Sequence, residues 1–514
     1  MAMLNLSRFM SKQQQRQRKR RRHQIRARNG WVASRSKRKG SPSQQDRNSL
    51  GSQIKGYSGL TLLEDVWCSI HSLLPLQDAA RVACVSQAFV RSWRCRPKLD
   101  FCENTLKALN KEACQNDDKA GDFKSRIDCI LKKHSGIGLK AVKFEFPLVY
   151  NQDHLAHLDS WLQIAVKLGI EELSLRVDGD YNFPCSLLSG GTGDRLRCLS
   201  LAACQFHPTV GLGCLRNLTR LQLSLVHIAS SELGCLLSSL FALEALELRS
   251  CDSIVCLNIP CLQQLSYLEV VTCLSLKAIE SKAPNLYSVW FSGDPQVKLS
   301  LGETWRIKKL HRHCNNFAFY ARTKLPSSMP NLESLSIRSD VEMVSTPMAP
   351  SKFLHLKSLS IAIGGLTFDY LSLVSFLDAS PSLETFNLEV MREWKKRVSI
   401  FEDHSNVRTM PGHHHFKLKN VKIIKFSAAK SVVELTRQIL EYATSLECLT
   451  LDTTHGMPRC SVNKTGKCIF MDKEALVEAH EGLLAAKMYI EPKVPSTVEF
   501  KVLEPCIRCH AVGL

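Results

Sequence analysis

Apolar residues recur along the middle of the chain in a six-residue pattern whose first, fourth and sixth positions are leucine or another apolar residue. The first positions are Leu139, Ile170, Leu196, Leu218, Leu243, Leu265, Leu286, Ile307, Leu332, Leu356, Leu383, Val421 and Leu446. They are separated by 31, 26, 22, 25, 22, 21, 21, 25, 24, 27, 38 and 25 residues. Side chains alternate along a strand, so the fourth and sixth positions share one face. The pattern therefore predicts a series of short strands that each bury one face.

One such strand cannot cover its own apolar face, but stacked neighbours can cover it together. Repeats of about 20–29 residues with this pattern are typical of leucine-rich repeats. The ninth position, where a polar atom can bond to the loop backbone, is occupied by Cys204, Cys251, Cys273, Asn315, Asp178, Asp294 and Asp340. The sequence thus predicts an α/β solenoid over residues 139–455, with a parallel β-sheet on its concave side and these cysteines in its core.

The repeats are irregular, and both ends of the array need a cap. The ninth-position rule fails at Val226 and Met391, and the 38-residue interval after Leu383 predicts an inserted surface loop over residues 392–419. We expect a helical lead-in over residues 102–138, starting near Phe101. A C-terminal cap is predicted over residues 456–514, with a helix near 473–487 and a last strand near 498–502.

Outward positions of the predicted strands offer a candidate surface for a protein substrate. Aromatic and arginine side chains are enriched where proteins bind one another most strongly. The predicted substrate-binding residues are Arg249, Tyr267, Glu269, Trp290, Lys309 and His311. The alternative is an ordinary solvated sheet face in which a loop covers Trp290.

The segment ahead of the repeats predicts three short helices within residues 60–101. Thr61 and Glu64 have the spacing of a capping box, and Pro75 ends the first helix. Apolar residues on one face of that helix are Val66, Ile70 and Leu73. Residues suited to cap the second and third helices are Asp78 and Ser86. So small a unit should dock on the solenoid or on a partner.

These helices resemble the F-box, which we place at residues 56–101. The matching residues are Leu62, Glu64, Asp65, Ile70, Leu73, Leu76, Asp78, Ala79, Val85, Ser86, Phe89 and Trp93. Leu63 stands where the F-box has a proline, and residues 97–101 resemble the common exit of the motif. A basic tail, an F-box and irregular leucine-rich repeats in this order resemble plant F-box/leucine-rich-repeat proteins, especially those of grasses.

The resemblance implies a non-catalytic substrate receptor of an SCF ubiquitin ligase. The F-box would bind a Skp1-type adaptor, which joins a cullin, and the repeats would hold a protein substrate. The adaptor-binding residues so implied are Leu62, Leu63, Glu64, Asp65, Ile70, Leu73, Leu76, Val85, Phe89 and Trp93. The alternative is a nuclear leucine-rich-repeat scaffold with no role in ubiquitination.

Positive charge is concentrated at the N-terminal end of the chain. Residues 1–50 hold 15 Lys or Arg and one acid, so +14 of the net +20 lies there. Few apolar residues accompany these charges, which predicts a disordered tail over residues 1–55. Two basic clusters suit a nuclear import signal: Lys19, Arg20, Arg21, Arg22, Lys37, Arg38 and Lys39. A plain polycation and a transit peptide are alternatives, and non-specific attraction to nucleic acid would follow in each case.

Hydropathy and the distribution of cysteines indicate the cellular compartment in which the protein is expected. No apolar run is long enough to span a membrane, and we expect no secretory signal. The 21 cysteines are an odd number and are scattered. Reduced thiols in the nucleus or cytoplasm are therefore expected.

Motifs for catalysis or metal binding are weak. Residues 506–510 read Cys-Ile-Arg-Cys-His, which matches a haem-attachment pattern but lies in a chain with no expected export signal. A structural zinc site needs about four ligands, and Cys460 and Cys468 have unsuitable spacing for a second knuckle. We therefore predict no metal, no cofactor and no catalytic residue.

Overall fold

The computed structural model divides the chain into two units, residues 1–61 and 62–514. The structure describes residues 64–85, 87–102, 119–146, 152–177, 181–189, 192–208, 215–391, 397–403, 407–411, 414–458, 468–506 and 508–510. The tail predicted to be disordered, its basic clusters, Leu62 and Leu63 lie outside the described residues. The fold below is that of the second unit alone.

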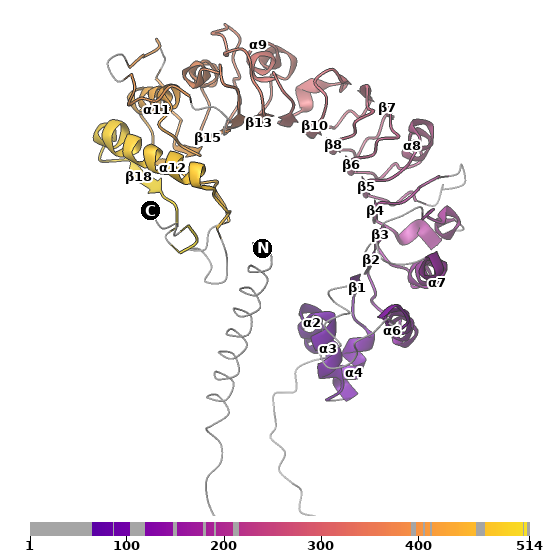
Figure 1. The fold of residues 1–514 in the computed structure, drawn as a ribbon. Helices are drawn as coiled ribbons and strands as arrows, with labels where there is room; N and C mark the ends of the chain where they lie inside the picture. The colour runs from indigo at the N-terminus through magenta and orange to yellow at the C-terminus, as the bar shows by residue number, and fades with distance from the viewer. Residues whose placement is uncertain are drawn as a thin grey trace, which may run out of the picture. The chain divides into compact units, whose positions relative to one another are not determined.

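A parallel sheet of fifteen strands runs through the described part of this unit. Its strands, in spatial order, are β1 (Lys98–Cys102), β2 (Ala141–Phe146), β3 (Glu172–Val177), β4 (Cys198–Ala202), β5 (Arg220–Ser224), β6 (Ala245–Arg249), β8 (Tyr267–Val271), β10 (Ser288–Ser292), β12 (Lys309–His313), β13 (Ser334–Ser339), β14 (Ser358–Ile363), β15 (Thr385–Val390), β16 (Asn420–Ile424), β17 (Cys448–Asp452) and β18 (Glu499–Leu503). They follow one another along the inner side of an arc (Figure 1). This is the predicted parallel-sheet solenoid.

The outer side of the arc carries helices and a small second sheet (Figure 1). The helices are α6 (Lys119–Lys133), α7 (Gln152–Lys167), α8 (Ser230–Leu237), α9 (Ala318–Ser328), α10 (Val374–Asp378), α11 (Lys430–Tyr442) and α12 (Lys473–Ala485). Short turns of 3-10 or π type are η1 (Cys185–Leu188), η2 (Thr192–Arg195), η3 (Thr304–Arg306), η4 (Tyr370–Leu373), η5 (Ala486–Ile490) and η6 (Glu491–Lys493). The small sheet consists of β7 (Cys256–Ile259), β9 (Ala278–Ser281) and β11 (Lys298–Ser300). The repeat pattern did not predict this second sheet.

The core is a ladder of the predicted apolar positions. Leu199 and Leu201 on β4, and Leu246 and Leu248 on β6, are fully buried. The parallel register places each pair beside the corresponding pair of the next strand. Every strand thus covers the face that its neighbour cannot cover alone, which stabilises the array through contacts between adjacent repeats.

The turn after a strand explains the ninth position of the repeat. Ala203 and Ser250 adopt a left-handed backbone, with φ of 55° and 50°, and each directly precedes a buried cysteine, Cys204 or Cys251. The Ala203 N–H bonds to the carbonyl of the next strand's last residue at 2.8 Å, which extends the ladder through the turn. Burial raises the pKa of the Cys204 thiol to about 12. Cys204 and Cys251 are buried core residues, as predicted.

Three helices precede the sheet, as the sequence predicts: α2 (Glu64–Leu73), α3 (Leu76–Ala83) and α4 (Gln87–Arg94). The prediction that Asp78 caps the second helix is wrong, because Pro75 holds that position. Asp78 lies in the first turn of α3 and pairs with Arg81 at 3.3 Å. Ser86 lies outside the described residues.

The three helices dock on the first strand of the solenoid. Leu76 is buried in the main core and Trp93 packs against it. The Arg96 guanidinium donates to the carbonyls of His71, at 2.9 Å, and Leu74, which fastens the end of α2 to the chain just before β1. The predicted helical lead-in is wrong at its start, because Phe101 lies in β1 and the sheet begins there.

The C-terminal cap agrees closely with its prediction. The expected helix near 473–487 is α12, and the expected strand near 498–502 is β18. Strand β18 pairs in parallel with β17, so the cap continues the repeat sheet. No helix among the described residues is long and apolar enough to cross the membrane.

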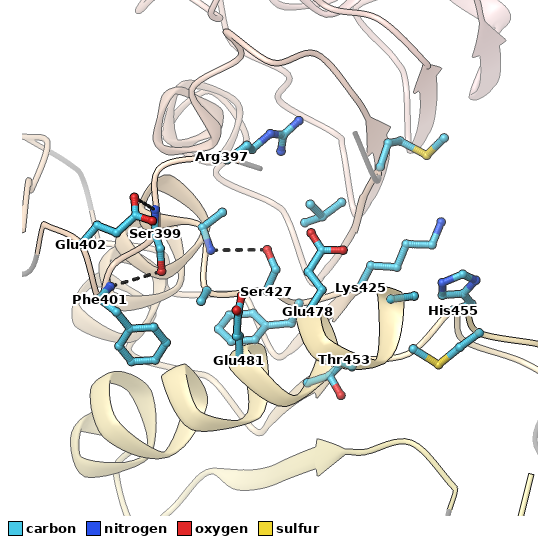
Figure 2. A pocket seen from close by; sticks show the side chains of 18 residues that line it. Arg397, Ser399, Phe401, Glu402, Lys425, Ser427, Thr453, His455, Glu478 and Glu481 are labelled. Carbon is cyan, nitrogen blue, oxygen red and sulfur yellow. Dashed lines mark hydrogen bonds between the residues drawn. The ribbon is translucent and has the colours of Figure 1, made fainter. Parts of the chain in front are cut away.

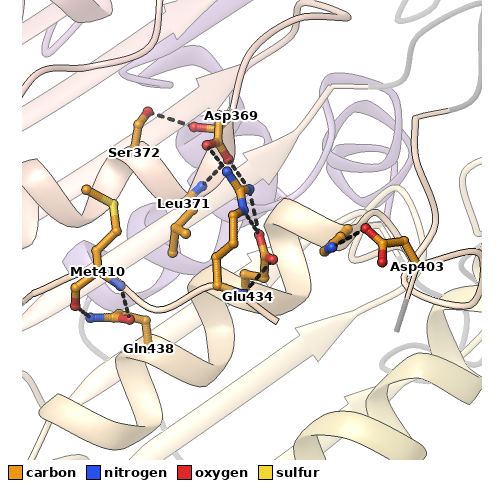
Figure 3. Close-up of polar contacts among 9 residues, drawn as sticks. Asp369, Leu371, Ser372, Asp403, Met410, Glu434 and Gln438 are labelled. Carbon is orange, nitrogen blue, oxygen red and sulfur yellow. Dashed lines mark hydrogen bonds and ion pairs between the residues drawn. The ribbon is translucent and has the colours of Figure 1, made fainter. Parts of the chain in front are cut away.

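The described parts of the predicted surface insertion are tied to the solenoid by polar contacts (Figure 3). The Arg408 guanidinium binds Asp369 at 2.8 Å and the buried Glu434 of α11 at 2.6 Å. Two residues on, the Met410 backbone exchanges two hydrogen bonds with the Gln438 side-chain amide. Arg408 and Met410 of the insertion are thus held against α11 by charge-assisted and backbone hydrogen bonds.

Candidate protein-binding face

The register of the sheet brings the six predicted substrate-binding residues together on four adjacent strands, β6, β8, β10 and β12. Trp290 lies between Glu269 on one side and His311 on the other. Tyr267 and Lys309 lie one row away, opposite Ser288 on either side. Glu269, Trp290 and His311 follow one another at intervals of 21 residues, and they form one row because successive repeats stack in register.

Trp290 and His311 form an aromatic pair at the centre of this face. Their ring centroids lie 3.7 Å apart with 24° between the planes. Trp290 remains 40% exposed, so no described loop covers it. Stacking fixes the indole before any partner arrives, which lowers the entropy cost of binding.

The His311 imidazole is held neutral by its surroundings. Burial lowers its pKa to about 4, and the charges of His313 and Arg338 act in the same direction. A neutral ring can stack on Trp290 without the cost of desolvating a charge. The pair is therefore an aromatic, uncharged centre at neutral pH.

This protonation behaviour gives a testable pH dependence. The unfolded chain protonates His311 near pH 6.5, whereas the folded chain does so near pH 4. Stability is therefore lost as the pH falls between these values, because the unfolded state binds the proton first. We expect His311→Gln to lose less stability than the unmodified chain between pH 7 and pH 5. Equal losses in the variant and in a control at the exposed His355 (His355→Gln) would contradict this.

Glu269 serves a different role from the one that the sequence suggested. It is only 5% exposed, and its carboxylate accepts from Arg249 Nε at 2.7 Å and from the Tyr267 hydroxyl at 2.6 Å. The hydrogen bond to Glu269 raises the pKa of Arg249, and burial together with Glu269 raises the pKa of Tyr267. Glu269 is thus a positioning residue beneath the surface, and Arg249 and Tyr267 face outward from it.

Tyr287 is a surface residue that the strand pattern missed because it precedes β10. Its ring is partly exposed and lies 5.5 Å from the Lys309 ammonium. Lys308 approaches the same ring at 5.9 Å. A cation over an aromatic face is attracted to it, so Tyr287 orients the lysine at the border of the aromatic centre.

The concave side continues beyond His311 as a shallow hollow of about 420 Å³. Polar side chains that line it are Ser336, Ser360, Asn387, Glu389 and Lys422. Four of them, Ser336, Ser360, Asn387 and Lys422, extend the row of Trp290 and His311 over β13, β14, β15 and β16. An aromatic centre with a polar margin is the usual arrangement of a protein-binding surface.

A second exposed surface lies on the helices ahead of the sheet. Leu73 is 85% exposed and Val85 is 78% exposed, and Val66 and Ile70 on α2 are also exposed. Of the predicted adaptor-binding residues, Ile70, Leu73 and Val85 therefore face outward.

The remaining residues of that predicted set divide into two groups. Leu76 and Trp93 face the solenoid core, so they dock the helices instead of offering a surface. Phe89 is partly buried and packs on His71, with ring centroids 5.0 Å apart. The side chains of Glu64 and Asp65 lie outside the described residues.

The sequence of residues 130–507 matches the family described as At1g61320/AtMIF1, LRR domain. The chain belongs to this leucine-rich-repeat family. The match runs from the last residues of α6 past the end of β18. It begins after the three helices α2, α3 and α4 and carries no information about them.

Two solved structures are similar to this leucine-rich-repeat chain at low identity. An internalin (inlF) from Listeria monocytogenes is 14% identical over 63% of this chain and 96% of its own, with a TM-score of 0.25. The ectodomain of the Arabidopsis thaliana receptor kinase GASSHO1/SCHENGEN3, in complex with CASPARIAN STRIP INTEGRITY FACTOR 2, is 14% identical over 61% of this chain and 42% of its own, with a TM-score of 0.22. A comparison with curated protein sequences gave no match.

A cavity of about 220 Å³ lies near the C-terminal end of the leucine-rich repeats, between α12 and the described part of the insertion (Figure 2). Three carboxylates line it, those of Glu402, Glu478 and Glu481. Its basic side chains are already engaged: Lys425 pairs with Glu389 at 2.8 Å, and Arg397 donates to a backbone carbonyl at 2.9 Å. This balance of charge does not favour a phosphate or another anion.

Proposed function

We propose that this leucine-rich-repeat protein is a non-catalytic substrate receptor of an SCF-type ubiquitin ligase. The leucine-rich-repeat domain is a protein-interaction scaffold, and the proposal adds what the scaffold is for. The observation that carries it is the set of exposed apolar residues on α2 and in the turn after α3, ahead of the first repeat strand.

This apolar surface has the properties of a contact for another protein. Leu73, Val85, Ile70 and Val66 are exposed residues of a short helical unit that packs Leu76 and Trp93 on the solenoid core. Covering an exposed leucine or valine side chain stabilises a complex by about 1.5–3 kcal/mol. Their place in a segment that resembles an F-box supports a Skp1-type adaptor, with its cullin, as the partner.

The way the helices dock supports a presenting function. The Arg96 bonds and the burial of Leu76 tie α2, α3 and α4 to the sheet, so the two surfaces belong to one unit. A protein held by Trp290 and its neighbours would then be kept at a fixed position relative to the adaptor. Fixed placement raises the effective concentration of the substrate at the ligase.

A second candidate function is a nuclear scaffold without ubiquitination. It is favoured by Leu63, which replaces the proline of the F-box family, and by a family match that begins only at residue 130. The basic clusters over residues 18–22 and 35–39 support nuclear import in both cases. The adaptor complex distinguishes the two candidates.

The experiment that tests the proposal is a binding assay with a purified Skp1-type adaptor. We expect the whole chain to bind it, and we expect a double variant, Leu73→Asp with Val85→Asp, to bind at least about 100-fold more weakly, because two carboxylates would enter an apolar contact.

The matched control is Leu274→Asp, since Leu274 is equally exposed at 78% but lies in a repeat turn. It should leave the adaptor affinity unchanged. Failure of the whole chain to bind, or equal weakening by the control, would refute the receptor function and favour the scaffold.

A further inference from the structure

Three cysteine sulfurs converge at the C-terminal end of the solenoid. The Sγ atoms of Cys468, Cys506 and Cys509 lie within 4.8 Å of one another. Cys468 precedes α12, whereas the other two follow β18. The fold thus brings the two ends of the segment that contains α12 and β18 close together. This places Cys468 beside the Cys506–Cys509 pair, which sequence spacing alone could not predict.

The local backbone is arranged so that two of the thiols share one turn. The N–H groups of Cys509 and His510 both donate to the Cys506 carbonyl, at 3.2 and 2.9 Å. A tight Cys-x-x-Cys turn of this kind lets both sulfurs face the same point, which is how zinc knuckles present two ligands.

His510 adds an observation that points independently to a metal. Its Nε2 bonds to the Ile469 carbonyl at 3.0 Å, so this nitrogen carries the proton, since a carbonyl can only accept. Its Nδ1 is buried and has no hydrogen-bond partner. A buried lone pair without a donor is costly. Histidines that bind metals commonly donate their other N–H to a backbone carbonyl in this way.

We propose that Cys468, Cys506 and Cys509 bind a structural zinc ion. His510 Nδ1 is not within 4.8 Å of all three sulfurs, and it would move towards the bound ion to become the fourth ligand. Three thiolates and one imidazole form a common tetrahedral zinc set. Binding releases three thiol protons, and the ion with three thiolates carries a net charge of −1.

A zinc ion at this end of the solenoid would stabilise the part of the fold that is least supported by the main core. The side chains of Met471, Ala475, Leu476 and Ala479 form a small cluster of their own, separate from the main core. Strand β18 is the last strand of the described sheet and pairs on one side only, with β17. An ion that joins Cys468 to Cys506 would close the chain around α12 and β18, and it would hold this last strand in place.

The experiment uses the whole chain, purified with its thiols reduced and then loaded with Zn²⁺ or Co²⁺. We expect about one ion per chain, and the cobalt form should show the thiolate-to-metal absorption of a tetrahedral site. Because this absorption requires thiolates, ions bound by the histidines at 413–415 would not produce it.

Variants locate the site. Cys506→Ser and Cys509→Ser should each weaken cobalt binding by more than about 100-fold, since loss of a ligand should exceed the effect of changing its supporting contacts. His510→Ala should weaken it as well. The matched control is Cys235→Ser, an exposed cysteine of α8, which should bind as the unmodified chain does.

Stability provides a second measurement. A chelator should lower the melting temperature of the unmodified chain and of Cys235→Ser, but should leave Cys509→Ser unchanged. The proposal is overturned if the reduced, cobalt-loaded chain shows no thiolate absorption, or if Cys509→Ser binds cobalt as tightly as the unmodified chain does.

Discussion

Replacing Arg322 by alanine is expected to lower the free energy of unfolding by about 3–5 kcal/mol, because three backbone carbonyls would lose the charged donor that they share. Arg322 lies on α9 and is almost fully buried. Its guanidinium donates to three backbone carbonyls, those of Ser375 at 2.8 Å, Ser351 at 3.0 Å and Ala349 at 2.5 Å. One side chain thus joins α9, α10 and the loop between β13 and β14.

The alanine variant would leave these three carbonyls without their donor, and each such loss is costly in a buried site. Urea unfolding of Arg322→Ala measures the effect. Arg81→Ala is the matched control, because Arg81 forms an exposed pair worth at most about 1 kcal/mol. A loss in Arg322→Ala no larger than that of the control would show that the Arg322 contacts do not hold these elements together.

Trp290→Ala is expected to have the largest effect on capture of a protein by the concave side. Aromatic residues at the centre of an interface commonly contribute about 2–4 kcal/mol, which corresponds to roughly 30- to 1000-fold in affinity. Trp290 is exposed and already oriented by its stacking on His311. Quantitative mass spectrometry of proteins recovered with the chain, with the proteasome blocked, measures this effect.

The matched control for this variant is Trp305→Ala. Trp305 is 50% exposed, but it lies in η3, outside the strands of the concave sheet. It should leave the recovered proteins unchanged, whereas Trp290→Ala should deplete them. Equal recovery with both variants would place the protein-binding surface elsewhere on the solenoid.

Much of the fold was predictable because its determinants are local and repeated. The apolar residues at the fourth and sixth positions of each repeat are visible in the sequence of that strand alone. Leu246 and Leu248 are examples, and both are buried. The helices α2, α3 and α4 were predicted from a proline break and apolar spacing for the same reason. The C-terminal helix and strand followed from similar local patterns.

The sequence-based predictions were wrong or incomplete where the secondary structure depends on pairing between residues that are distant in the sequence. Residues 98–102 form β1 because they pair in parallel with β2. The sequence of residues 98–102 alone does not show that this partner strand is available. The small sheet of β7, β9 and β11 likewise depends on stacking of the convex turns.

The candidate site was predicted only in part. The repeat register correctly placed Trp290 beside His311 and Glu269. It could not show that Glu269 is buried beneath Arg249 and Tyr267, since that depends on side-chain contacts across strands. Tyr287 was missed because it precedes its strand.

We propose that the solenoid captures a protein and that the helices ahead of it deliver this protein to a ubiquitin ligase. The most direct measurement compares ubiquitination of the captured proteins, with the proteasome blocked, between the whole chain and the Leu73→Asp, Val85→Asp variant. We expect the unmodified chain and the double variant to recover the same proteins. Only the unmodified chain should recover them with ubiquitin attached. Equal ubiquitination with both chains would contradict the proposal.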